Sequence, residues 1–148
     1  MMKSNQLIFT KGKEKALKTL FSQDNFGYLA IGYQDETQDT NGFENPVTDA
    51  DDDGFNEINV QTFPSYARIP LVAQDEVNVD YDTETVYMKF TADLDIDNII
   101  EITPINQFAI VDSSDSTDPN TVIYAAATFP EFVKSEKIAI TFVIDIGL

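Results

Sequence analysis

The segment KIAITFVIDI (137–146) constrains the fold more than any other part of the sequence. Apolar residues recur in it at every second position, and they are Ile138, Ile140, Phe142, Ile144 and Ile146. A period of two places all of these side chains on one face of an extended strand, whereas a helix would distribute them around its circumference. The segment therefore predicts a half-buried β-strand, which must pair within its own sheet or with a neighbouring subunit.

Further short apolar segments, separated by turn-forming residues, have the composition or alternation of strands. They are residues 26–33, 66–73, 84–92, 98–103, 105–112 and 122–129. The last of these is rich in small residues, which predicts that another element packs closely over it. Short strands in succession, without helices between them, favour an antiparallel sandwich over a parallel α/β sheet.

One helix is expected before the strands, over residues 10–22, with Thr10 as its N-cap. Its apolar residues recur at helical spacing and share one face. They are Ala16, Leu17, Leu20 and Phe21.

A long acidic segment, residues 34–57, lacks periodicity and is rich in Asp, Asn and Gly, which predicts a loop. The expected fold is therefore all-β: an antiparallel β-sandwich with one short N-terminal helix and a long acidic loop. We expect a single domain over residues 1–148, with an N-terminal arm and helix at 1–25 and the sandwich at 26–148.

The residue types present exclude most catalytic chemistry. The chain has no cysteine and no histidine, so disulfides, thiolate metal sites and histidine-based catalysis are ruled out. Paired carboxylates are the remaining catalytic route, and the acidic residues lie mainly in loops without an aromatic groove beside them. We therefore expect no enzymatic activity.

The net charge of −17 predicts repulsion from nucleic acids and anionic membranes, so neither is an expected partner. No apolar stretch approaches the length that crosses a bilayer. Residues 1–20 differ from the rest, because they hold five lysines and one acid. Lys11, Lys15 and Lys18 on the expected helix form either a basic contact strip or a merely solvated face.

The run DADDDG (49–54) resembles the start of a calcium loop. Asp49, Asp51 and Asp53 take the first three ligand positions of a helix–loop–helix site, and Glu57 takes the ninth. The twelfth position, where a bidentate glutamate closes the shell, is Val60. Calcium is therefore the one cofactor considered, and a solvated acidic turn is the alternative interpretation.

Arg68 is the only arginine, and it lies inside an expected strand beside Tyr66. Two interpretations of this pair remain open. Arg68 and Tyr66 could contact an acidic residue across a subunit interface, or Arg68 could form a salt bridge within its own chain.

Several short segments, in their order and spacing, resemble small structural proteins of tailed bacteriophages. An apolar YLAIG strand precedes a long loop, and an E-I…Y-A-R segment (Glu57, Ile58 and 66–68) opens the next strand. Three apolar strand segments of the same type follow, at residues 105–112, 123–129 and 134–144.

The resemblance implies a β-sandwich virion protein of the tail, neck or fibre-attachment region, present in several copies and without catalytic residues. Its partners would be other copies of itself and other virion proteins. Its location would be the virion, after synthesis in the cytoplasm of the bacterial host. A capsid decoration protein and a calcium-dependent binding or adhesion module are the alternative functions.

Overall fold

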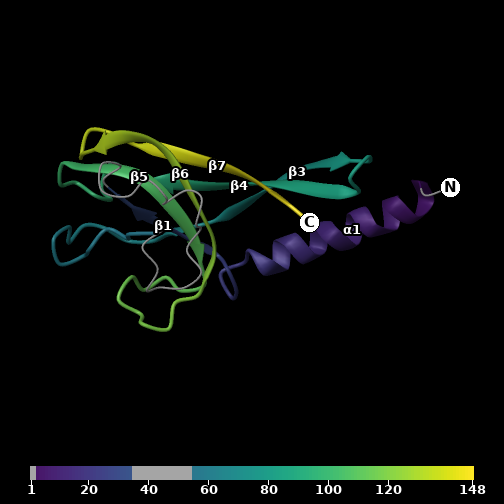
Figure 1. Ribbon diagram of the computed structural model, residues 1–148, viewed down its shortest axis with the longest axis horizontal. Coiled ribbons are helices and arrows are strands. Elements are labelled where there is room, and N and C mark those ends of the chain that lie inside the picture. Colours follow the sequence, from purple (N-terminus) through teal and green to yellow (C-terminus); the bar gives the residue numbers. More distant parts are fainter. Residues whose placement is uncertain (1–2, 35–54) are drawn as a thin grey trace.

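In a computed structural model, residues 3–34 and 55–148 of the chain are described (Figure 1). The helix α1 spans Lys3–Leu20. The strands are β1 (Tyr28–Gly32), β2 (Ile69–Pro70), β3 (Val72–Asp80), β4 (Thr85–Leu94), β5 (Thr103–Val111), β6 (Ile123–Lys134) and β7 (Ile140–Gly147).

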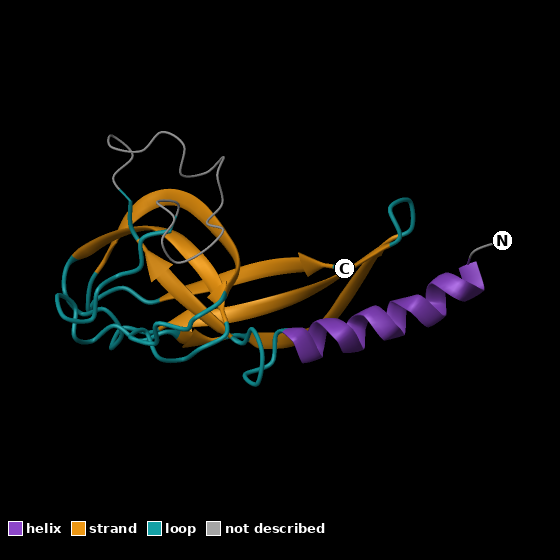
Figure 2. Ribbon diagram, turned by 60° about the horizontal axis from the view of Figure 1, so that its bottom comes forward, coloured by secondary structure: helices purple, strands orange, loops and turns teal. Residues whose placement is uncertain are grey.

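The strands form two antiparallel sheets that pack face to face. One sheet has the order β2-β1-β5-β6, and the other has the order β3-β4-β7. The helix does not join this sandwich but extends away from one end of it, alongside the β3–β4 hairpin (Figures 1 and 2). The all-β sandwich expected from the sequence is confirmed.

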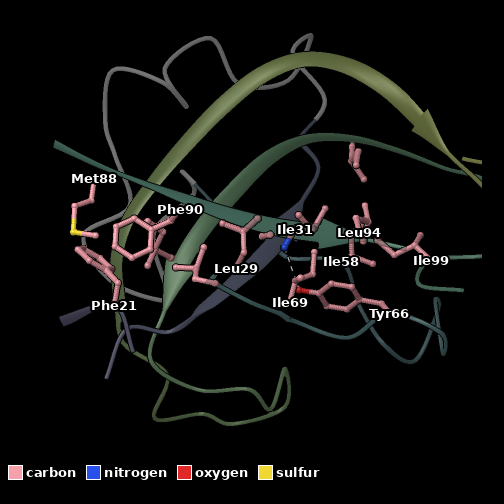
Figure 3. Packing of buried hydrophobic residues seen from close by; sticks show 14 of the residues in the cluster. Phe21, Leu29, Ile31, Ile58, Tyr66, Ile69, Met88, Phe90, Leu94 and Ile99 are labelled. Carbon is pink, nitrogen blue, oxygen red and sulfur yellow. Dashed lines mark hydrogen bonds between the residues drawn. The ribbon is translucent and has the colours of Figure 1, made fainter. Parts of the chain in front are cut away.

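The core lies between the two sheets because each contributes one apolar face (Figure 3). Leu29 and Ile31 of β1 face Phe90 and Leu94 of β4, and all of these side chains are fully buried. Phe21, just after α1, closes one end of this core, with its ring 5.4 Å from that of Phe90. The helix is therefore fixed to the sandwich through its C-terminal end.

The helix begins earlier than the sequence pattern predicted. α1 starts at Lys3, so Thr10 lies inside the helix and is not its N-cap. Residues 3–9 contain neither proline nor glycine, and nothing in them interrupts helical hydrogen bonding. The expected apolar face is present in part, because Leu17 is buried and Ala16 is exposed.

Several strand assignments differ from the pattern. Residues 66–73, expected as one strand, divide between β2 of one sheet and β3 of the other, and Ile138, expected on the buried face, lies before β7 and is exposed. Residues 98–102 form a turn-containing connection, in which Ile99 has a φ of 56° and a fully buried side chain. The Asn98 side chain fixes this connection by bonding the backbone N–H and carbonyl of Ala67. The sequence pattern did not predict the second half of β3, because the charged residues Asp75 and Glu76 interrupt the apolar alternation of this exposed edge strand.

Candidate functional site

The best-defined polar cluster in the described residues is built on Arg68, whose side chain is only 4% exposed. Its Nη2 lies 2.8 Å from Glu57 Oε1, and its Nε lies 2.9 Å from Glu57 Oε2. Two parallel bonds of this kind use the planar fork of the guanidinium and are stronger than a single charged contact. Arg68 therefore pairs with an acid of its own chain.

Tyr66 joins the same cluster from the buried side. Its hydroxyl donates to Glu57 Oε2 and accepts from the backbone N–H of Ile31, at 3.1 Å (Figure 3). Burial, and then the charge of Glu57, raise the pKa of Tyr66 well above its ordinary value of 10.0. The hydroxyl therefore remains protonated and acts as a fixed bridge between β1 and the segment that carries Glu57.

Arg68 also reaches the long connection between β5 and β6. Its Nη1 donates to the carbonyl of Ser113 at 2.9 Å and to Thr121 Oγ1 at 3.0 Å. The Glu57–Tyr66–Arg68 network thus holds together three segments that are distant in sequence. This is a structural role, and both residues proposed for a subunit interface, Tyr66 and Arg68, have intramolecular partners.

Replacing Tyr66 with phenylalanine should lower the free energy of unfolding by about 1–3 kcal/mol, measured by urea denaturation. The change deprives the Ile31 N–H of its acceptor and the Glu57 carboxylate of one donor. Tyr81→Phe is the matched control, because Tyr81 is 55% exposed. An equal, small effect of both variants would show that the hydroxyl bridge contributes nothing.

The raised pKa of Tyr66 makes the effect of Tyr66→Phe on stability depend on pH. Since the folded-state pKa lies above the unfolded value near 10.0, the hydroxyl contributes stability that is present below pH 10. That contribution is lost as the pH rises toward the folded-state pKa. The difference in stability between wild type and Tyr66→Phe should therefore shrink at strongly alkaline pH.

The calcium prediction falls mainly on residues outside the described part of the chain, since Asp49, Asp51 and Asp53 are not among residues 3–34 and 55–148. Glu57 is described, and both of its carboxylate oxygens accept bonds from Arg68 or Tyr66. No group of three or more acidic residues with metal-binding geometry occurs among the described residues. Calcium binding by this loop stays a prediction.

The lysines of α1 lie on the surface as expected. Lys11, Lys15 and Lys18 are exposed, and Lys18 lies 3.1 Å from Glu14 one turn earlier. Lys13 is directed differently, because its Nζ donates to the backbone carbonyl of Glu84 at the tip of the β3–β4 hairpin. This last contact ties the middle of the helix to the hairpin and leaves the other three lysines facing solvent.

A second candidate surface lies where the two sheets fail to cover each other, along β6 and β7. Ala125 pairs with Ile110 and Ala127 with Phe108, so both alanines share the core-facing side of their sheet. Both are nevertheless exposed. We call this uncovered line, formed by these alanines and the half-buried core-facing residues of β7, the seam.

Aromatic side chains close the two ends of the seam. At one end Phe129 of β6 meets Phe142 of β7, with ring centroids 5.6 Å apart. At the other end Tyr124 packs edge-on against Phe21 at 5.0 Å. Between them the core-facing side chains of β6 are small and exposed, so the close packing predicted over residues 122–129 is present only at Tyr124 and Phe129 among the described residues.

The two strands that border the seam differ as sheet edges. In the described residues β6 and β7 each end a sheet and do not pair with each other. β6 carries Pro130 and a register shift, both of which impede pairing with a further strand. β7 pairs with β4 along its whole length without a bulge, so its outer edge is regular.

Comparison of the chain with models of protein families, with curated proteins and with solved structures finds no match. Among the described residues, α1 is not long and apolar enough to cross a membrane.

Proposed function

We propose that this chain is a structural virion protein of a tailed bacteriophage, which assembles in several copies in the tail, neck or fibre-attachment region. The order of apolar segments that resembles such proteins supports this context. The seam is the observation that carries the assembly itself. Its partners are other copies of the chain and other virion proteins, and the chain has no catalytic role.

The seam supports assembly because it leaves core-facing residues of a sandwich in water. Each square ångström of apolar surface removed from water stabilises an association by roughly 25 cal/mol, before the costs of binding. Small side chains at Ala125 and Ala127 leave room for larger side chains of an incoming segment. A neighbour that covers this line would complete the core that the single chain leaves open.

The residues of one segment that carries the resemblance bond to one another. The Glu57 and Tyr-Ala-Arg residues that carry it form the Glu57–Tyr66–Arg68 network within one chain. This network fixes the β5–β6 connection to the sandwich and needs no ligand. This role fits a structural protein better than an enzyme.

An Ala127→Lys variant tests the use of the seam. A lysine at this exposed position can extend into solvent in the monomer, so the fold should be kept, whereas a charge in a covered apolar contact should prevent assembly. We expect wild type to form a species of several copies in mass photometry, alone or with its virion partners. The variant should form species of fewer copies than wild type.

Asn78→Lys provides the matched control, because it adds the same charge at an exposed position on β3. It should assemble as wild type does. A strict monomer for the wild-type chain, even in the presence of its partner proteins, would contradict the proposed function. If the chain does assemble, imaging of intact particles would distinguish a tail or neck position from a capsid surface.

A further inference from the structure

The β4–β5 and β6–β7 connections lie at the end of the sandwich farthest from α1 (Figure 1), and they contain four exposed isoleucines. Ile102 is the most exposed, at 80%, and Ile96, Ile100 and Ile138 are each more than a third exposed. Exposed apolar groups gathered on one surface mark an interaction site more often than isolated ones do. We call these four isoleucines the end patch.

The end patch is held in place by a buried lysine. Lys134 is fully buried and donates from Nζ to the carbonyl of Ile99 at 3.2 Å and to that of Ser135 at 2.6 Å. These bonds join the connection before β5 to the connection after β6. The pairing of Leu94 with Ile140 brings the two connections together from the other sheet. These contacts therefore hold in place the backbone that carries the isoleucines.

Acidic residues neighbour the isoleucines of the end patch in sequence. Asp95 and Asp97 flank Ile96, Glu101 lies between Ile100 and Ile102, and Glu136 lies in the turn that precedes Ile138. Asp95, Asp97 and Glu136 are exposed, and Ser65 holds the Glu101 carboxylate by donating to Oε2. The surface thus combines apolar side chains with negative charge, which selects a partner surface that is positively charged.

The chain itself offers one such surface. Five of its nine basic residues lie in residues 1–20. Of the other four, Arg68 and Lys134 are buried, Lys89 pairs with Asp145 at 3.3 Å, and Lys137 lies beside the end patch itself. Two end patches would repel each other through their acids, so the lysine face of α1 is the complementary surface.

We propose that the end patch of one copy receives α1 of a second copy, in a head-to-tail contact led by Lys11 and Lys15. The helix and the end patch lie at opposite ends of the molecule, so one contact leaves both complementary surfaces free for the next copy (Figures 1 and 2). Repeated contacts of this type produce a ring when the rotation closes and a filament when it does not. The inference rests on the proposed multi-copy assembly and adds to it a second interface, separate from the seam.

The absence of cysteine makes a direct test simple, because introduced thiols are the only ones present. One preparation carries Gly12→Cys, which lies beside Lys11 and one turn before Lys15 and has open space around it, a second carries Ile102→Cys, and the two are mixed with a flexible bismaleimide cross-linker. Both positions are exposed, so folding should be unaffected, which circular dichroism melting checks. We expect a covalent dimer from the mixture and little product from either preparation alone.

Asn78→Cys in place of Ile102→Cys is the control, and it should give little dimer. Failure of the Gly12–Ile102 pair to cross-link, while wild type still forms species of several copies, would overturn this interface and leave the assembly intact. Efficient cross-linking of Ile102→Cys to itself would also overturn it. A wild-type chain that remains a monomer with its partners would contradict the interface and the proposed function together.

Charge exchange gives a second readout. Lys15→Glu should raise the dissociation constant for self-association roughly tenfold, which is at the lower end of the coupling measured for close interfacial charge pairs. Adding Glu101→Lys to the same chain should restore part of that loss, since the opposite charges again face each other. An unchanged dissociation constant for Lys15→Glu would count against the helix as the occupant.

Discussion

Replacing Arg68 with alanine is expected to lower the free energy of unfolding by about 2–4 kcal/mol. The variant leaves the Glu57 carboxylate without its bidentate partner and removes the donors to Ser113 and Thr121. Leaving an ionised group without its partner in a buried position costs more stability than the intact pair contributes. Because Glu57 keeps 20% of its side chain exposed, water offsets part of this cost. Urea denaturation followed by tyrosine fluorescence measures the change.

Lys89→Ala is the control for Arg68→Ala, since it also removes one cation from an ion pair. Its partner Asp145 is 60% exposed, so the loss should remain below about 1 kcal/mol. Arg68→Lys should recover only part of the stability, because an ammonium group cannot reproduce the fork of bonds to Glu57. A similar, small loss for Arg68→Ala and Lys89→Ala would show that the buried network contributes no more than a surface pair.

The strands that alternate strictly could be predicted from the sequence, because one face of each is directed toward the core and is less exposed than the other. β4 and β7 are of this kind, and the pattern identified both. The conformation of residues 98–102 could not be predicted, because their three isoleucines do not share one face. Ile99 points into the core, and Ile100 and Ile102 point into solvent. What determines their conformation is Asn98 and Lys134, whose partners lie 31 and 35 residues away.

The partners of Arg68 could not be predicted from the sequence either. The sequence placed Arg68 beside Tyr66 and left open whether its acid was in the same chain. Ser113 and Thr121, its other partners, lie 45 and 53 residues further on, in a loop whose position depends on the pairing of β5 with β6. No local pattern carries that information. The seam was missed for a similar reason, because the exposure of Ala125 and Ala127 depends on which strand ends each sheet.

Replacing Phe21 with alanine is expected to lower the free energy of unfolding by about 3–5 kcal/mol. Phe21 is 2% exposed, and its ring packs edge-on against Phe90 at 5.4 Å and against Tyr124 at 5.0 Å. Truncation would leave a cavity at the end of the core. Tyr81→Ala removes an aromatic ring that is 55% exposed, and it should change the free energy of unfolding by less than about 0.5 kcal/mol.

The same variant should also release α1, because Phe21 and Leu17 are the buried side chains that fix the helix to the sandwich. A helix of this length without packed partners is only marginally stable in water. Amide hydrogen exchange should therefore become faster throughout residues 11–20 in Phe21→Ala, under conditions in which β4 and β5 remain protected. Unchanged protection of the helix would mean that its other contacts, including that of Lys13 with the hairpin, hold it. If it is released, head-to-tail association should weaken as well, because a mobile helix presents its lysines to the end patch at a greater cost in conformational entropy.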